Sequence, residues 1–207
     1  MKVTKYPQSC LKLEKNDKSL MIDIGIFVTQ KYKLEDLQPI DALLITHQHA
    51  DHLDPDVAKQ LSGAGVPIYA NQDVADKLSD LEVTVLNDSD QQEIAGFNVT
   101  ARDLPHCKMV DGSDGPPNTG YVIDGNFFHP GDGTSIDNLQ VESLAAPVAG
   151  PSVSLFDAVK FARQVGAMNV IPIHYSNPVF YNDPNVLKER FGDANVIVLN
   201  DGESTEL

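Results

Sequence analysis

Three histidines and one aspartate cluster between positions 47 and 52, at His47, His49, Asp51 and His52. In an extended connection, side chains two residues apart project to the same side. His47 and His49 can therefore bind one cation, while Asp51 and His52, at the following turn, can bind a second. Neutral imidazole with carboxylate suits Zn²⁺, with iron or manganese as alternatives. A solvated loop that happens to contain histidines is the competing interpretation, but histidine rarely recurs at this spacing, so we predict a metal site.

Three later residues supply the ligands that a two-metal site still lacks. His106 opens a glycine-rich loop, Asp132 follows a hairpin, and His174 ends a strand. Each comes directly after an expected strand, where loops present functional groups at one edge of a sheet. Taken singly, each is more often an ordinary loop or core residue, and their weight comes from completing the set. The sixth histidine, His129, lies within the hairpin, and we assign it a structural role.

Two further side chains are candidates for substrate contact. Lys108, beside His106, could pair with a substrate phosphate or carboxylate, although a loop lysine is more often simply solvated. Tyr175, next to His174, could donate a hydrogen bond to an oxyanion, against the alternative of plain packing. Cys107 also adjoins a candidate ligand. Because no separate general base accompanies it, we interpret it as a small buried side chain rather than a nucleophile.

Short strands with helices between them must position these residues. Asp54 is a good N-cap and Pro55 fits the first helical position, so a helix is expected directly after the histidine cluster. Turns are expected at Lys15–Lys18 and around Asp124-Gly125. The predicted strands are 10–14, 19–23, 41–46, 66–70, 81–86, 93–94, 97–104, 121–129 as a hairpin, 144–148, 170–173 and 196–199, and further helices are predicted at 71–78, 154–165 and about 183–191. This order favours stacked sheets with helices outside.

The composition limits the number of domains, the location and the partners that the protein can have. With 207 residues, 42% of them hydrophobic, the chain has material for one well-cored domain, 1–207, and no low-complexity linker divides it. Apolar runs of about four to six residues exclude a transmembrane helix, and the opening residues lack a secretory signal, so we expect a cytoplasmic protein. A net charge of −15 makes long nucleic acids unlikely partners. The only cysteines, Cys10 and Cys107, allow neither a disulfide framework nor a cysteine-rich zinc module.

In these motifs the chain resembles the metallo-β-lactamase-fold superfamily. Its ordered motifs fall on Asp23, His47-x-His49-x-Asp51-His52, His106, Asp132 and His174, which together span about 150 residues of the chain. The strand before Asp132 and the run from Val170 to Tyr175 resemble the small cytoplasmic metal-dependent hydrolases that include ascorbate-6-phosphate lactonase. The resemblance implies an α+β fold, a four-layer αββα sandwich of two mixed β-sheets flanked by helices. It also implies His47, His49 and His106 on one metal, Asp51, His52 and His174 on the other, Asp132 bridging both, and Asp23 supporting a ligand.

At three places this sequence differs from particular subfamilies of the superfamily. Oxygen-reducing diiron members have Glu where this chain has His49, and lactamases with a cysteine ligand have it where Asp132 stands. Gln8-Ser9-Cys10 stands where the lactonase-like relatives often have Gly-His-Ser, so the subfamily is not fixed.

The function implied is a hydrolase with two Zn²⁺ ions, iron or manganese being alternatives, that acts on a small lactone, ester or phosphoester. Asp132 would hold the metal pair together, and Asp51 would orient the nucleophile or accept a proton. The expected partner is a small molecule, anionic ones included, with no membrane and no long nucleic acid, and homo-oligomers stay open. The alternatives are a mononuclear iron persulfide or thiol dioxygenase on the same fold, using two His and one Asp, and a metal-stabilised protein without catalysis.

Overall fold

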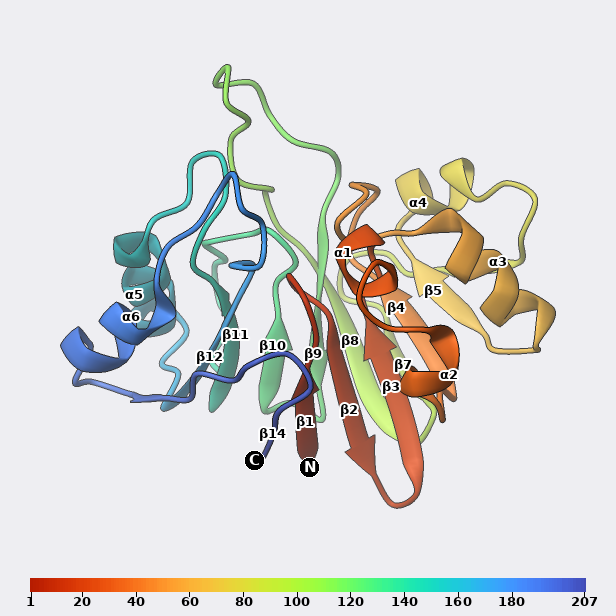
Figure 1. The fold of residues 1–207 in the computed structure, drawn as a ribbon, viewed down its shortest axis with the longest axis horizontal. Helices are drawn as coiled ribbons and strands as arrows, with labels where there is room; N and C mark the ends of the chain where they lie inside the picture. The colour runs from red at the N-terminus through yellow and green to blue at the C-terminus, as the bar shows by residue number, and fades with distance from the viewer.

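The computed structural model describes residues 1–207 as two seven-stranded sheets packed face to face, with helices on both outer sides (Figure 1). The first sheet has the strand order β14-β1-β2-β3-β4-β5-β6 and the second β13-β12-β11-β10-β9-β8-β7. The strands of the first sheet are β1 (Lys2–Lys5), β2 (Leu11–Lys15), β3 (Lys18–Ile22), β4 (Ala42–Ile45), β5 (Ile68–Ala70), β6 (Val83–Val85) and β14 (Ser204–Glu206). Those of the second are β7 (Gln91–Ile94), β8 (Phe97–Asp103), β9 (Thr119–Ile123), β10 (Phe127–His129), β11 (Ser143–Pro147), β12 (Asn169–Ile173) and β13 (Asn195–Val196).

The two sheets share one pattern of strand pairing. In each, three successive antiparallel pairs are followed by three parallel pairs, as far as β6 in the first sheet and β13 in the second. The sequence shows no internal repeat at this level, so the likeness of the two halves lies in their topology. Both sheets are mixed, as the resemblance implied, and the α+β sandwich is confirmed.

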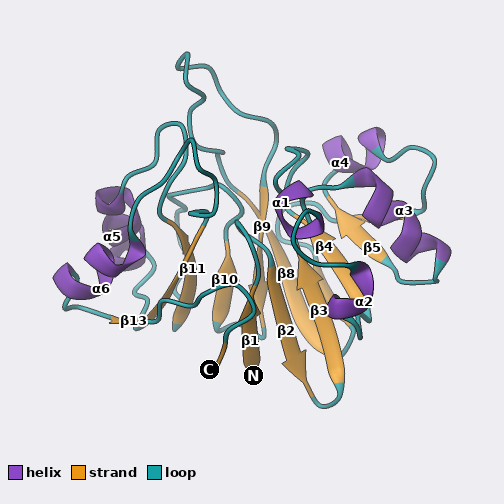
Figure 2. Cartoon of the chain, viewed as in Figure 1, coloured by secondary structure: helices purple, strands orange, loops and turns teal.

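Helices cover the outer faces of both sheets (Figure 2). The first sheet carries α1 (Ile26–Thr29), α2 (Leu34–Leu37), α3 (Pro55–Gly63) and α4 (Gln72–Lys77), and the second carries α5 (Leu155–Gln164) and α6 (Pro184–Arg190). The Asp54 side chain caps α3 by accepting hydrogen bonds from the backbone N–H groups of Asp56 and Val57, with Pro55 at the first helical position, as predicted. None of the six helices combines the length and apolarity needed to cross a membrane.

The alternation of side chains along the strands builds three apolar layers. In β4, Leu44 faces the layer between the sheets, whereas Leu43 and Ile45 face α1–α4. In β12, Ile171 faces the middle layer and Val170 faces α5 and α6. Because these strands are buried on both faces, they read as continuous apolar runs in the sequence.

The N-terminal strand was not predicted, because three of the four residues in Lys2–Lys5 are polar. It pairs with β2 and with β14, and the side chain of Lys5 is fully buried. Lys5 Nζ lies 2.7 Å from Asp201 Oδ1, and Lys31 Nζ lies 2.9 Å from Asp201 Oδ2. The charge of the buried lysine is thus balanced by a carboxylate almost 200 positions away in the chain, and no local sequence pattern predicts that pairing.

We expect Asp201→Asn to destabilise the protein by about 3 kcal/mol at neutral pH, because it leaves a buried ammonium group without its partner. Burial would raise the pKa of Asp201, but the hydrogen bond and charge of Lys5, with those of Lys31, outweigh burial and hold the pKa below 3.8. A carboxyl pKa depressed by folding stabilises the folded state above the unfolded-state pKa. The difference between wild type and variant should therefore be full at neutral pH and vanish as the pH falls through the folded pKa of Asp201.

Urea unfolding at several pH values measures this difference. The matched control is Asp193→Asn, which breaks an ion pair with Arg163 whose side chains are both 58% exposed and which should cost less than about 1 kcal/mol. Equal losses in the two variants would contradict the stabilising role of the buried pair.

Candidate metal centre

All seven predicted ligand residues meet at one edge of the sandwich. They follow strands of both sheets: the histidine cluster comes after β4, His106 after β8, Asp132 after β10 and His174 after β12. They form two groups whose ligand atoms lie within 4.8 Å of one another in each group, His47, His49, His106 and Asp132 in one, and Asp51, His52 and His174 in the other. The loops that carry them gather at the same end of both sheets (Figure 1).

Asp132 lies between the two groups. Its Oδ1 is 3.0 Å from His52 Nε2, and its Oδ2 is 3.4 Å from His106 Nε2 and 3.3 Å from His174 Nε2. The backbone of Asp132 is held on both sides, since its N–H donates to Asn118 Oδ1 and its carbonyl accepts from the Cys107 N–H. The carboxylate is therefore fixed where it can contact ions in both groups.

Hydrogen bonds at Nδ1 orient three of the histidines. His52 Nδ1 lies 2.7 Å from the Asp23 carboxylate, His106 Nδ1 2.6 Å from the Cys107 carbonyl, and His174 Nδ1 2.9 Å from the Ala149 carbonyl. Because these partners are acceptors, each Nδ1 carries the proton and each Nε2 keeps its lone pair for a metal. Asp23 is fully buried and also accepts from the backbone N–H and the hydroxyl of Thr46. It supports His52 in the manner that the resemblance implied.

Several buried polar atoms of the centre have no hydrogen-bond partner. They are His52 Nε2, His106 Nε2 and Asp132 Oδ1. Buried polar atoms are rarely left unsatisfied in folded proteins, because each costs the free energy of its lost hydration. His52 Nε2 and Asp132 Oδ1 lie 3.0 Å apart without the geometry of a hydrogen bond, and His106 Nε2 lies 3.4 Å from the other carboxylate oxygen, Asp132 Oδ2. The donor set of imidazole and carboxylate at this spacing fits transition-metal ions.

The charges of the centre fit the same assignment. Burial lowers the pKa of His47. Burial would also lower the pKa of His106 and His174, but hydrogen bonds and the negative charge of Asp132 outweigh it and raise both to about 10. The pKa of Asp132 itself lies well below its usual range, because the neighbouring histidines outweigh the effect of burial. Asp132 thus favours protonation of these imidazoles, so protons and metal ions would compete for the same nitrogen atoms.

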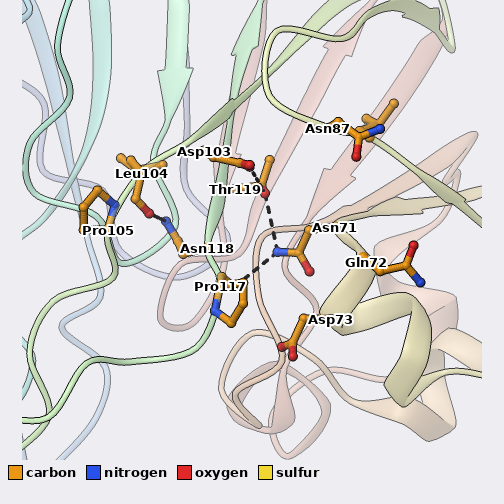
Figure 3. Close-up of a pocket in the computed structure, with 11 residues that line it drawn as sticks. Asn71, Gln72, Asp73, Asn87, Asp103, Leu104, Pro105, Pro117, Asn118 and Thr119 are labelled. Carbon is orange, nitrogen blue, oxygen red and sulfur yellow. Dashed lines mark hydrogen bonds between the residues drawn. The ribbon is translucent and has the colours of Figure 1, made fainter.

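Two asparagines tie the ligand-bearing loops together (Figure 3). Asn71 caps α4 through its Oδ1, which accepts from the Val74 N–H, and its Nδ2 donates to the carbonyls of Thr46 and Pro117. Asn118 donates to the carbonyls of Leu104 and Pro130. These bonds connect the backbone segments that lead into His47, His106 and Asp132. Both asparagines also line a separate polar pocket of about 450 Å³.

The remaining predicted residues lie away from the centre. Lys108 forms an exposed ion pair with Asp114, and the Tyr175 hydroxyl donates to the Leu199 carbonyl while the ring packs under Lys5. Neither side chain lines the cavity at the metal groups. Cys107 is buried, as expected of a packing residue.

The histidine outside the candidate ligand set has a structural environment. His129 is fully buried, its Nε2 lies 2.7 Å from the Ser9 carbonyl, and its Nδ1 accepts from the Gly131 N–H. Both ring nitrogens are therefore engaged by the backbone, which fits the structural role assigned to it.

Gln8 belongs to the centre, although its type and position did not single it out as functional. Its side chain is buried, and its Nε2 donates to Asp51 Oδ2 over 3.0 Å and lies 3.2 Å from His174 Nε2. Its Oε1 accepts from the Ser176 N–H, and its carbonyl from the His174 N–H. The departure from relatives at Gln8-Ser9-Cys10 was the one sequence signal that pointed here.

We expect Gln8→Leu to weaken metal binding at the Asp51, His52 and His174 group by about 10- to 100-fold, because removing a partner of a metal ligand typically has that effect. Competitive titration against a zinc-binding chromophore measures the affinity. Gln92→Leu, on exposed β7, is the matched control and should bind metal like wild type. Equal affinities of Gln8→Leu and wild type would contradict the role of Gln8.

Comparisons with known proteins agree with this fold. Residues 2–174 match the family model described as "Beta-lactamase superfamily domain". The chain is 29% identical over 183 residues to Protein Rv0786c of Mycobacterium tuberculosis, with 84% of each chain covered. It is also 29% identical over 194 residues to the UPF0173 metal-dependent hydrolase PH1671 of Pyrococcus horikoshii, again with 84% of each covered. Among solved structures, Igni18, a metallo hydrolase from Ignicoccus hospitalis, superposes with a TM-score of 0.81 at 22% identity, covering 100% of this chain and 98% of that one.

Proposed function

The chain belongs to the β-lactamase superfamily, and on that premise we propose that it is a metal-dependent hydrolase with two metal ions in one centre. Relatives named metal-dependent hydrolases support the activity. Five imidazoles and two carboxylates, with no thiolate, favour two Zn²⁺ ions, with iron or manganese as alternatives. The substrate is a small molecule with a hydrolysable lactone, ester or phosphoester bond.

One observation carries the proposal. Three buried atoms of the centre, His52 Nε2, His106 Nε2 and Asp132 Oδ1, have no hydrogen-bond partner, and they belong to both ligand groups or to the carboxylate between them. A structural metal site needs one closed ligand group. Two groups that share a carboxylate beside an open cavity fit a catalytic centre instead.

Bound divalent ions supply two effects, a lowered pKa of an attacking water and polarisation of the bond to be cleaved. The residues of this chain supply the rest. Asp132 and the Nδ1 hydrogen bonds of the histidines fix the ligands, so that little reorganisation is needed during reaction. Asp51 lines the cavity with its side chain 21% exposed, within reach of both water and substrate. We assign to it the transfer of a proton from the attacking water to the leaving group.

Elemental analysis of protein purified without chelator tests the proposal. We expect close to two transition-metal ions per chain, because the seven residues fill two ligand groups. A content of one iron with negligible zinc would instead favour the mononuclear iron oxygenase, which uses two His and one Asp and leaves the other candidate ligands without a metal. Removal of metal by a chelator should abolish hydrolysis, and Zn²⁺ should restore it. Location in the cytoplasm and the subunit number stay predictions.

A further inference from the structure

The cavity above the two ligand groups lacks the basic side chains that are typical of anion-binding sites. Its volume is about 340 Å³, at the small end of pockets that hold small-molecule ligands. Candidate metal ligands form its floor. Its walls carry apolar side chains from four segments of the chain: Ile26 and Phe27 of α1, Met109 after β8, Pro151 after β11, and Phe180 after β12.

No lysine or arginine lines this cavity. Lys108, the nearest in sequence to a ligand, is paired with Asp114 on the outside. An anion that leaves water needs a cation or several hydrogen-bond donors in exchange, since its desolvation is costly. The carboxylates of Asp23, Asp51 and Asp132 would offset most of the positive charge of two divalent ions, so the metal centre itself leaves little surplus charge for an anionic substrate.

The cavity wall offers one neutral hydrogen-bonding side chain. Asn177 lines the cavity, and its Oδ1 accepts from the Val179 N–H over 2.8 Å. This bond orients the amide and leaves its Nδ2 group without an acceptor in the protein. An Nδ2 group held in this way can donate to a neutral carbonyl or ether oxygen of a ligand.

We infer that the substrate is an uncharged acyl compound, a carboxylic ester, thioester or lactone, whose short apolar group packs against Phe27, Met109 and Phe180. This inference rests on the proposed function and narrows it, because it excludes phosphoesters and substrates that carry a carboxylate. Burial of the apolar group supplies binding energy in proportion to its area. Phe180 and Met109 are partly exposed loop residues and set which acyl groups fit.

Matched esters test the inference on metal-loaded, full-length protein. 4-Nitrophenyl butyrate and 4-nitrophenyl hemisuccinate share a leaving group but differ in acyl charge, and bis(4-nitrophenyl) phosphate represents the phosphodiesters. We expect kcat/KM for the butyrate to exceed that for the hemisuccinate at least about tenfold, and the butyrate to exceed the acetate by about tenfold through its two extra methylenes. Calorimetric titration with 4-phenyl-2-butanone, a neutral ketone that is not hydrolysed, gives a binding readout independent of turnover.

Variants of the wall assign the preference to these residues. Phe180→Ala and Met109→Ala should each remove most of the preference for butyrate over acetate and weaken ketone binding, while both metals stay bound. Asn177→Lys should raise kcat/KM for the hemisuccinate about tenfold by adding the missing cation. Phe156→Ala on α5, 71% exposed and outside the cavity, is the matched control and should leave every rate unchanged.

The outcomes separate the inference from the proposed function. A metal-dependent preference for the hemisuccinate or the phosphodiester would overturn the inference and leave the hydrolase proposal standing. A protein that holds two metals but hydrolyses none of these compounds, or whose rates are unaffected by chelator, would overturn the proposed function together with the inference. A butyrate preference that survives both Phe180→Ala and Met109→Ala would also overturn the inference, because the apolar wall would not be its source.

Discussion

Replacing Asp132 with alanine is expected to lower the metal content from two ions per chain toward one and to reduce hydrolysis at least about a hundredfold. Asp132 is 4% exposed and lies within 3.0 to 3.4 Å of His52, His106 and His174. Its removal takes a ligand from each group and the negative charge that lets two dications approach within about 4 Å. Loss of a direct ligand should exceed the 10- to 100-fold that is typical of outer partners. Elemental analysis and the rate with 4-nitrophenyl butyrate measure the two effects.

Asp114→Ala is the matched control for this variant, because Asp114 is exposed and contacts only Lys108 among charged groups. It should keep both metals and full activity. An Asp132→Ala protein with two metals and near-normal turnover would show that Asp132 is only a turn residue after β10.

The second large effect is expected from Gly25→Ala, which should displace the loop that carries Asp51 and His52. Gly25 has φ −96°, a conformation open to alanine, so the effect is steric. A Cβ at this position would lie 2.1 Å from the backbone C and O of Asp51 and 2.6 Å from the backbone N of His52. Hydrogen bonds from Ile26 N to Ala50 O and from Asp54 N to Ile24 O hold the two segments together, so neither can retreat easily. We expect a destabilisation of about 2–3 kcal/mol and loss of the metal bound by this loop.

Gly63→Ala separates this contact from a general effect of replacing glycine. Gly63 ends α3, and a Cβ there would meet nothing within 4 Å. This control should be neutral or stabilise the protein by up to about 1 kcal/mol. Thermal unfolding and metal content are measured for both variants. Wild-type values for Gly25→Ala would contradict the prediction, because the loop of Asp51 and His52 would then accommodate the Cβ without loss of stability.

The sequence was informative wherever a signal is local. The buried strand before His47, the capped helix after Asp54, and the hairpin around Asp124-Gly125 all lie where turn residues, caps and apolar periodicity predicted them. The candidate ligands could be selected because metal binding requires particular residue types, which here follow directly after strands. Their convergence then followed from the parallel pairing of strands around β4 and β12, which brings strand ends to one edge.

Elements that depend on distant partners could not be predicted in this way. The strand β1 is polar by composition and exists because β2 and β14 flank it. The predicted strand 196–199 is regular only over Asn195–Val196, which pair with Asn169 and Val170 at the start of β12. Gln8 joins the candidate centre through its contacts with Asp51 and His174 rather than through its residue type. The environment of Tyr175 likewise depends on Leu199 and Lys5, which lie on other segments.

The division of the ligands between two sheets bears on how the protein acquires its stability. In a zinc finger a few neighbouring ligands can gather a metal while the chain is still unfolded. Here the ligands extend from His47 to His174, and Asp132 joins the groups only after the second sheet has packed on the first. We therefore expect the complete centre to form only when both sheets have packed into the native structure. Bound metal ions would then stabilise the folded protein by slowing its unfolding, without speeding its folding.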